Sequence, residues 1–561
     1  MTCQEKILSD AYADAIIDYD IPESFRSPTD LDYCIYDLDD KYRIVHAERS
    51  GVAPLSIGVY SYASIPKLYG LMQTFRAENL TDMGNLRIQA PPLSLQGKGV
   101  ILGFVDTGIR YQLDAFLDEE GNSRILAIWD QTIQEGEPPE GFQYGTEYAR
   151  EEINRALKEQ QPLTVVPSTD ENGHGTAMAS AAAGSVLNQG LTFRGAAPQA
   201  DIVMVKVKQA KSYLREYYLV PEDVVAYQEN DIMEAVKYLE QMAVVFERPV
   251  VIVLGIGTNM GNHTGASPLG DYLNKIAAKR SRAIVVCGGN EGDKEHHYMG
   301  NVPDQVEIRV EENTKGFCME LWNSTSDTYN VVIRTPVGEM TSTIDFQNGI
   351  DRNFSFVFEK TKVYVGILVV EQKSGEQLIF FRFQDPSPGV WSIIVSPSGR
   401  ERLRGNGSFH MWLPITAFID GSVSFLKPDP EVTLTEPSNA AGVITISTYN
   451  GITESWFAES GRGFAKNDMI KPDLAAPGVQ VSTALGERTG SSMAAALSAG
   501  CVAQFMEWAI VEGNSYLVES QAIKGYFIKG AVRENNIIYP DRQWGYGKLN
   551  ISGTFETLAR T

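Results

Sequence analysis

The sequence predicts an α/β protein with helices on both faces of a parallel sheet, a small α+β unit before it and an inserted all-β, jelly-roll-like stretch. Two observations predict the sheet: short, fully apolar runs recur along the chain, and segments with helical periodicity lie between several of them. Strands that are apolar on both faces are typical of parallel sheets covered by helices on each side. The apolar runs are Val100–Val105, Ile202–Val207, Val250–Leu254, Ala283–Val286 and Val443–Ile446, and two of the expected helices are Asp231–Phe246 and Leu269–Lys279.

The N-terminal unit is predicted to span residues 1–75. Two alternating runs, Tyr33–Leu38 and Tyr42–Ala47, flank an Asp-Asp-Lys turn, which is a pattern typical of a β-hairpin. A helix is expected around Ala11–Ile17, and this helix would make the unit an α+β domain.

The stretch at residues 302–432 interrupts the α/β pattern. It lacks helical periodicity and holds short strand-like runs that are separated by Gly, Pro, Asn and Asp turns. Evenly spaced strands without helices are typical of an antiparallel sandwich or jelly roll. We therefore predict an inserted β-domain here, with residues 76–301 and 433–561 forming the α/β domain on either side of it.

Composition narrows the function classes. The 561 residues are 43% hydrophobic and 21% charged, as expected for an ordinary globular protein, and the formal net charge is −23. Because a strongly acidic protein repels phosphate backbones and anionic lipid, nucleic acid is not an expected partner. The longest apolar stretch, Met493–Val511, contains Gln504 and Glu507 and is rich in small residues, so we expect a buried helix and no membrane insertion.

The cysteines predict neither a disulfide framework nor a structural zinc site, because they are odd in number, far apart and contain no Cys-x-x-Cys pair. The first twenty residues lack the basic and apolar regions of a secretory signal peptide. A reducing, cytoplasmic location is the expectation. The five cysteines are Cys3, Cys34, Cys287, Cys318 and Cys501.

Three motifs carry residues suited to chemistry, each where a strand and a helix are expected to meet. Asp106 ends a buried run before Thr-Gly, His174 lies in Asn-Gly-His-Gly-Thr, and Ser492 lies in Gly-Ser-Ser-Met-Ala. Taken singly, the aspartate reads as a turn residue, the histidine as a structural one and the serine as a helix N-cap. An aspartic protease is excluded because no second Asp-Thr-Gly or Asp-Ser-Gly accompanies the first.

In the order Asp, His, Ser, the three motifs together resemble the signatures of the subtilisin-like serine proteases (subtilases, peptidase family S8). Two further segments match the family, Lys471–Gly478 upstream of the serine and Trp544–Leu549 near the end of the chain. The resemblance covers roughly residues 95–300 and 433–555, and it implies a subtilisin-like sheet.

The resemblance implies a serine endopeptidase that needs no cofactor and acts on protein or peptide substrates. A serine hydroxyl is a poor nucleophile at neutral pH, so His174 would accept the proton of Ser492 during attack on the peptide carbonyl. Asp106 would hold the imidazole in the correct tautomer and stabilise its charged form. The reaction would transfer an acyl group to water through a covalent acyl-enzyme.

The oxyanion of such a reaction needs hydrogen-bond donors. Asn290 follows the buried run that ends in Val-Val-Cys-Gly-Gly and matches the oxyanion-hole position of the family, with an Asx turn as the alternative role. The backbone amide of Ser492 is the expected second donor. Gly288 and Gly289, just before the asparagine, are predicted to bind substrate.

Gly255, Ile256 and Gly257 resemble the segment that pairs with an extended substrate. Gly255 replaces the serine that is usual in the family, but pairing through the main chain does not depend on that side chain. These three residues are therefore predicted to bind substrate as well.

The insertion points to one group within the family. Asn290 and Ser492 lie about 200 residues apart, about 135 more than the equivalent pair in subtilisin. An inserted jelly roll, an N-terminal prodomain and the missing signal peptide together resemble the clostridial spore-germination proteases (the Csp group). Those relatives activate a cortex-lytic enzyme by cutting its proform and keep their prodomain bound after self-cleavage. The resemblance implies a protein zymogen as substrate and a spore-associated location.

The resemblance also implies that residues 1–75 are a prodomain, an intramolecular chaperone and inhibitor whose tail runs through the substrate groove. Processing is expected between about Ile65 and Thr81. A permanent extra domain is the alternative. The Csp group includes proteins that have lost triad members, so a catalytically silent regulatory or binding protein with a retained prodomain is the rival function.

No metal site is predicted. The pair His296-His297 lies beside acidic residues, but without further ligand spacing we expect solvated surface histidines. No D-x-D-x-D-G calcium loop occurs in the sequence.

Overall fold

The computed structural model describes residues 1–20, 32–72, 94–185, 194–324, 326–398 and 405–560. Its centre is a sheet of order β24-β23-β12-β10-β5-β8-β6-β7, in which every neighbouring pair is parallel except β6 and β7. All five predicted apolar runs form strands of this sheet, so this part of the fold prediction is confirmed. The strands are β24 (Leu474–Pro477), β23 (Ile444–Tyr449), β12 (Arg282–Cys287), β10 (Val250–Leu254), β5 (Ile101–Asp106), β8 (Asp201–Lys206), β6 (Ile125–Asp130) and β7 (Thr146–Ala149).

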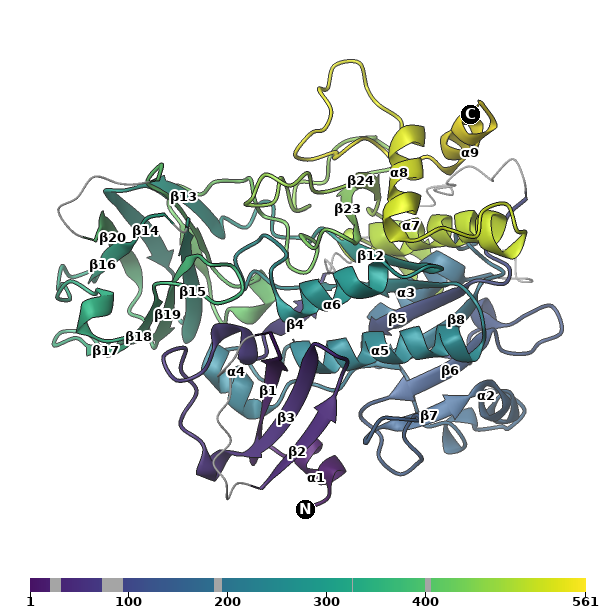
Figure 1. Cartoon of the computed structure of the whole chain (residues 1–561), viewed down its shortest axis with the longest axis horizontal. Coiled ribbons are helices and arrows are strands. Elements are labelled where there is room, and N and C mark those ends of the chain that lie inside the picture. Colours follow the sequence, from purple (N-terminus) through teal and green to yellow (C-terminus); the bar gives the residue numbers. More distant parts are fainter. Residues whose placement is uncertain (21–31, 73–93, 186–193, 325, 399–404, 561) are drawn as a thin grey trace.

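Helices cover both faces of the central sheet (Figure 1). On one face, α5 (Glu229–Val245) and α6 (Pro268–Ala277) bury their apolar sides against alternate strand residues, among them Ile252. On the other face lie α3 (His174–Ala183) and α7 (Ser491–Met506), which share a core with the intervening strand residues, among them Val253. Because successive strand residues point to opposite faces, the fully apolar strands serve both cores. The remaining helices are α2 (Arg150–Ala156), α4 (Ser212–Tyr218), α8 (Ser520–Gly530) and α9 (Ile551–Arg560).

The long apolar helix predicted near the C-terminus is α7, which continues without a break to Val511. Residues Ser491–Val511 are long and apolar enough to cross a membrane, but 78% of their most apolar window is buried inside the protein. The apolar length of this helix is therefore accounted for by packing against α3 and the sheet.

The N-terminal unit is a three-stranded antiparallel sheet of order β1-β3-β2, with β1 (Tyr12–Asp18), β2 (Tyr33–Asp37) and β3 (Tyr42–Glu48). The predicted hairpin is confirmed, because Tyr33 pairs with Ala47. The helix expected around residues 11–17 is wrong: these residues form β1, and the helix of this unit is α1 (Cys3–Leu8). Every second residue of β1 is buried, but two of these buried residues are aspartates. A pattern based on hydrophobicity alone therefore does not reveal the alternation of buried and exposed positions.

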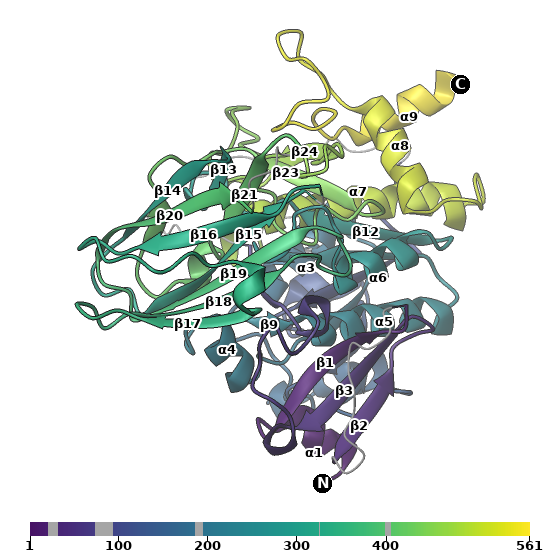
Figure 2. The same ribbon diagram turned by 60° about the vertical axis from the view of Figure 1, so that its left-hand side comes forward.

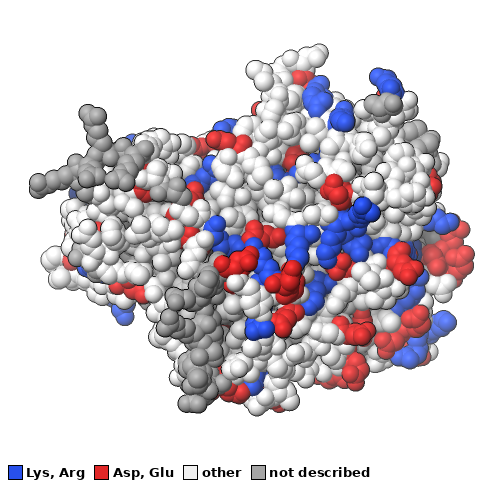
Figure 3. All heavy atoms as spheres, viewed as in Figure 1, with Lys and Arg blue, Asp and Glu red and all other residues white. Residues whose placement is uncertain are grey.

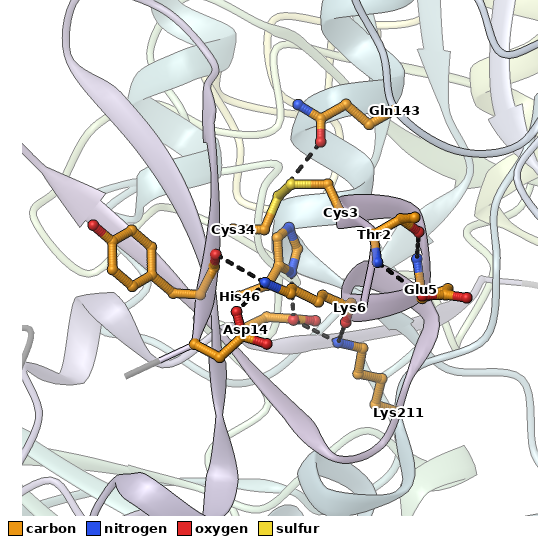
Figure 4. Close-up of a disulfide and its surroundings, with 11 residues drawn as sticks. Thr2, Cys3, Glu5, Lys6, Asp14, Cys34, His46, Gln143 and Lys211 are labelled. Atoms are coloured by element: carbon orange, nitrogen blue, oxygen red, sulfur yellow. Dashed lines mark hydrogen bonds and ion pairs between the residues drawn. A yellow bond between two sulfur atoms is a disulfide. The ribbon is translucent and has the colours of Figure 1, made fainter. Parts of the chain in front are cut away.

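A disulfide joins Cys3 at the start of α1 to Cys34 on β2 (Figure 4). The sequence predicted no disulfide framework and a reducing compartment, and it gave no sign of this single bridge. The two residues are 31 positions apart in sequence, but α1 packs beside β2 and brings their Cα atoms to 5.5 Å. Cys287, Cys318 and Cys501 are free and buried.

The inserted stretch folds into two antiparallel sheets that face each other over a shared apolar core (Figure 2). Its first strand, β13, starts at His297 and pairs with β21, so the insertion begins a strand earlier than the predicted residue 302. One sheet has the order β13-β21-β15-β19-β18-β17 and the other β16-β20-β14-β22. The strands are β13 (His297–Asn301), β14 (Asp304–Val310), β15 (Gly316–Asn323), β16 (Tyr329–Arg334), β17 (Asp351–Ser355), β18 (Lys362–Leu368), β19 (Gln377–Gln384), β20 (Gly389–Pro397), β21 (Ser408–Trp412) and β22 (Val423–Phe425).

Ion pairs connect the N-terminal unit to the helical face of the central domain. Lys275 on α6 lies 2.8 Å from Asp39 in the β2–β3 turn, and Lys41 in the same turn lies 3.2 Å from Asp271 on α6. Figure 3 shows basic and acidic side chains intermingled on this face, with no separate basic patch.

Candidate active site

The three predicted catalytic side chains lie in one chain of hydrogen bonds. Nδ1 of His174 is 2.7 Å from Oδ1 of Asp106, and Nε2 of the same ring is 3.0 Å from Oγ of Ser492. All three residues are at most 1% exposed. Side chains that are 68 and 318 positions apart in sequence are therefore within direct bonding reach.

Each of these residues is held at the end of a regular element. Asp106 is the last residue of β5, His174 the first of α3, and Ser492 the second of α7. The residues that precede the two helices are Gly173 and Gly490, with φ of 88° and 151°, values that side chains with a β-carbon rarely adopt. These two glycines let the chain turn sharply enough to present the histidine and the serine at the carboxyl ends of the parallel strands, where ligand sites of such sheets lie.

Asn290 lies beside the nucleophile loop. Its Oδ1 accepts a hydrogen bond from the backbone amide of Ser491, at 3.0 Å. Its Nδ2 is buried and has no hydrogen-bond partner among the described residues. A buried amide that lacks a partner is costly, so this N–H group is available to an acceptor that arrives with the reaction.

A segment of the chain itself occupies the cleft. Strand β4 (Leu68–Leu71) lies between β11 (Ile256–Gly257) and β9 (Tyr227–Gln228) and pairs antiparallel with both. The amide of Met72 donates to the carbonyl of Gly255 at 3.0 Å. The carbonyl of Met72 accepts a hydrogen bond from the amide of Ser492 at 3.3 Å, so this carbonyl lies beside Ser492.

The predicted substrate-binding residues fall into two groups. Gly255, Ile256 and Gly257 contact the β4 segment through the main chain: Ile256 is opposite Leu71, and Gly257 is opposite Gly70.

Gly288 and Gly289 form no backbone hydrogen bond with the described β4 segment. The carbonyl of Gly288 accepts from Thr435, and a β-carbon on Gly289 would lie 2.6 Å from the side chain of that threonine. In this structure the two glycines therefore allow residues 433–436 to pack closely beside the cleft.

The subtilase family model matches residues 97–326 and 405–547. The chain belongs to the subtilase family. As a subtilase it is a serine-type endopeptidase, and its substrates are proteins or peptides. Between its two matched ranges the family model leaves residues 327–404 unmatched, and the described residues of this stretch belong to the insertion.

One solved structure agrees with this assignment. The CspB protease of Clostridium perfringens is 30% identical to this subtilase, with a TM-score of 0.73 over 83% of this chain and 94% of that one. The patellamide maturation protease PatG is 12% identical, with a TM-score of 0.38 over 84% of this chain and 94% of that one. A lanthipeptide protease is also 12% identical, with a TM-score of 0.37 over 83% of this chain and 90% of that one. No curated protein sequence matches the chain significantly.

The glycine at position 255 of this subtilase is explained by its neighbours. A β-carbon there would lie closer than 3.0 Å to Sδ of Met178 and 3.0 Å from Cε1 of His174. Met178 is fully buried on α3, one turn after the histidine. The departure from the family serine is therefore matched by a methionine that fills the space of the missing side chain.

Asp170 is a residue of the site that the sequence did not reveal. Its Oδ1 accepts from the hydroxyl of Thr107 at 2.8 Å and from the amide of Gly173 at 2.7 Å. Its Oδ2 accepts from the amide and the hydroxyl of Thr176, at 2.9 and 2.6 Å. This carboxylate ties the loop after Asp106 to the first turn of α3. The sequence feature that could have pointed to Asp170 is the presence of an acidic residue four places before the motif histidine.

The cysteine and the two histidines that lie close to Asn290 in the sequence are all buried. Burial raises the pKa of the Cys287 thiol to about 12, so it stays protonated behind the oxyanion loop. The expectation of solvated surface histidines is wrong, because His296 and His297 are both buried. His296 bonds Glu291 at 3.0 Å, and His297 bonds His410 at 2.9 Å.

No group of three or more His, Cys, Asp or Glu side chains that could hold a metal ion occurs among the residues that the structure describes.

Proposed function

We propose that this subtilase is made as a proenzyme in which Asp106, His174 and Ser492 form the catalytic triad and residues 1–72 act as an inhibitory prodomain. The observation that carries the proposal is the hydrogen bond from the amide of Ser492 to the carbonyl of Met72. A peptide carbonyl that faces a triad serine and its amide is arranged as a substrate is before attack.

In the proposed reaction His174 takes the proton of the Ser492 hydroxyl through Nε2 as Oγ attacks the carbonyl carbon. Asp106 bonds Nδ1 and keeps the ring in the tautomer that leaves Nε2 free to accept. The negative charge that develops on the carbonyl oxygen is stabilised by the amide of Ser492 and by Nδ2 of Asn290. The histidine then returns the proton to the leaving amine, and water releases the acyl group.

By the same geometry the bond that follows Met72 is the proposed processing site. It falls inside the window of residues 65–81 expected from the sequence, most of which, from residue 73 on, lies outside the described residues. Met72 would be the last residue of the prodomain, and residues 68–72 would remain in the groove as an inhibitor after the cut.

A buried polar cluster supports retention of the prodomain. Asp14 on β1 lies 2.6 Å from Lys211 and accepts from Gln228 at 2.7 Å, and both partners belong to the central domain. Figure 4 shows Asp14, His46 and Lys211 together behind the disulfide. Burial alone would raise the pKa of Asp14, but Lys211 and His46 outweigh it and hold the pKa well below its ordinary value.

The insertion also contacts the prodomain. Glu320 on β15 accepts from the hydroxyl of Tyr62 at 2.7 Å and from the amide of Gly261 at 2.9 Å, which joins three parts of the chain at one carboxylate. Lys373 pairs with Asp18 of β1 at 2.9 Å. These contacts support a prodomain that stays bound, as the resemblance to the spore-germination proteases implies. That resemblance also supports a protein zymogen as the substrate.

The proposal is tested by expressing the full chain and its Ser492→Ala variant side by side. We expect the parent chain to yield a fragment of residues 1–72 and a new N-terminus at Gln73, identified by mass spectrometry, and the variant to stay intact. A fluorophosphonate probe is expected to label the parent once the prodomain has been digested away. An intact parent chain that never takes the label would instead support the rival function, a catalytically silent binding protein.

A further inference from the structure

Gly70 is a residue of the β4 segment that lies against the insertion. It is buried, and it is the third residue before the proposed scissile bond, counting Met72 as the first. A β-carbon on Gly70 would lie 2.6 Å from Cδ1 of Ile415 and 3.2 Å from Cε1 of Phe418. Real β-carbons do not approach other atoms closer than 3.0 Å, so only glycine fits here without movement of the surrounding side chains.

Ile415 and Phe418 lie in the segment that follows β21 of the insertion. Both side chains are 1% exposed and belong to the same apolar core as Met72. They form an apolar roof over the groove, which is walled on its two sides by β9 and β11.

The roof is fixed to the catalytic domain at two points. Nδ2 of Asn259, just after β11, donates to the carbonyl of Leu413 at 3.1 Å. The amide of Thr416 donates to the carboxylate of Glu291, which directly follows the oxyanion residue, at 3.1 Å. Because the segment is anchored beside the substrate strand and beside the oxyanion loop, it cannot move away without disturbing either.

We propose that Ile415 and Phe418 restrict the third residue before the scissile bond to glycine, so that this enzyme selects peptide substrates with Gly at that position. This inference rests on the proposed function, since it takes protein substrates to follow the path of residues 68–72. Alanine would place its β-carbon 2.6 Å from Cδ1 of Ile415, and because ordinary van der Waals contact begins at 3.4 Å, that methyl group would have to move by about 0.8 Å. Branched and charged side chains require displacement of the buried roof, and a charged one also loses its hydration.

The first test uses the processed enzyme and peptides built on Leu-Tyr-Gly-Leu-Met, with Gly, Ala, Val or Lys at the third position before the cleaved bond. We expect kcat/KM to fall about tenfold for Ala and a hundredfold or more for Val and Lys. In the variant Ile415→Ala/Phe418→Ala the ratio of Gly to Val peptides is expected to shrink to below about tenfold. Ile333→Ala, an equally buried truncation in the other sheet of the insertion, should keep the parental ratio. The proposal is overturned if the parent enzyme cleaves all the peptides equally well. It is also overturned if Ile415→Ala/Phe418→Ala leaves the ratio of kcat/KM for the Gly and Val peptides unchanged.

The second test does not depend on catalysis. In the Ser492→Ala background, Gly70→Val should expel the β4 segment from the groove and make it sensitive to added thermolysin. Adding Ile415→Ala/Phe418→Ala should restore resistance. If the Gly70→Val chain resists thermolysin as well as its parent does, the proposed subsite is refuted, whether or not the enzyme cleaves peptides. A different outcome is that Gly70→Val becomes sensitive to thermolysin as expected, but no peptide is cleaved and no fluorophosphonate label appears. In that case the proposed protease function fails, while the restriction of this position to glycine by Ile415 and Phe418 is supported.

Discussion

The carboxylate of Asp170 accepts a hydrogen bond from the hydroxyl of Thr107, at 2.8 Å, and so joins the two loops that carry Asp106 and His174. The same carboxylate receives three further hydrogen bonds from the start of α3. It does not touch the nucleophile, and it therefore acts by fixing the distance between the aspartate and the imidazole.

Asp170→Asn should lower kcat by about ten- to a hundredfold with little change in KM, because an amide cannot accept all four hydrogen bonds and the triad loses its alignment. Steady-state kinetics on the processed enzyme measure this. Asp114→Asn, at an exposed position of the same domain, is the control. A loss confined to thermal stability, with kcat unchanged, would show that Asp170 has only a structural role.

Gly255→Ser, the change toward the usual family residue, should reduce activity by about tenfold because the new side chain collides with Met178 and crowds the ring of His174. Removing the obstruction with Met178→Ala in the same chain should recover most of the loss. Activity of the double variant no better than that of Gly255→Ser would contradict this explanation of the glycine.

Glu436 gives the stability of the protein a definite pH dependence. Burial raises its pKa to about 7, and its Oε2 has no hydrogen-bond partner among the described residues. The folded state therefore holds a proton that the unfolded state has already lost, and stability falls as pH rises from about 4.5 to about 7.

The contribution is about 3 kcal/mol at most. In the Ser492→Ala background, thermal melts at several pH values should show Glu436→Gln losing less stability than its parent across this interval. Parallel curves for the two chains would mean that the carboxyl titrates normally.

Asp14→Ala should release the prodomain, since it leaves Lys211 buried and without its partner, at a cost of about 3–5 kcal/mol. Size-exclusion chromatography of the processed protein measures whether residues 1–72 elute with the enzyme. Asp37→Ala removes an exposed ion pair to Arg43 in the same unit and should leave retention unchanged. Full retention in Asp14→Ala would show that the groove contacts alone hold the fragment.

The central domain could be predicted from sequence because its signals are local. The strand before Asp106 is apolar throughout, and the three motifs stand at strand and helix ends, so both the fold and the proposed triad follow from short stretches of chain. The rest depends on contacts made elsewhere. In β1 the buried positions include Asp14, which tolerates burial because Lys211, His46 and Gln228 bond its carboxylate.

The expectation that a segment between residues 65 and 81 runs through the groove came from the family resemblance, because no local pattern of residues marks the strand β4. Strands β9 and β11 are two residues long, and they hold β4 through backbone hydrogen bonds that leave no pattern in side-chain types. The disulfide likewise depends on α1 packing beside β2, which the spacing of Cys3 and Cys34 does not indicate.

The roof over Gly70 sets the order of events during synthesis on the ribosome. Ile415 and Phe418 are translated roughly half a minute after Gly70 at ordinary elongation rates, and Ser492 later still. The residues that cover Gly70 are therefore absent while the N-terminal unit emerges from the ribosome. A chain that ended before the insertion was complete would carry residues 1–72 without an enclosed groove, and it would also lack Ser492, so by the proposed mechanism it could not cut itself.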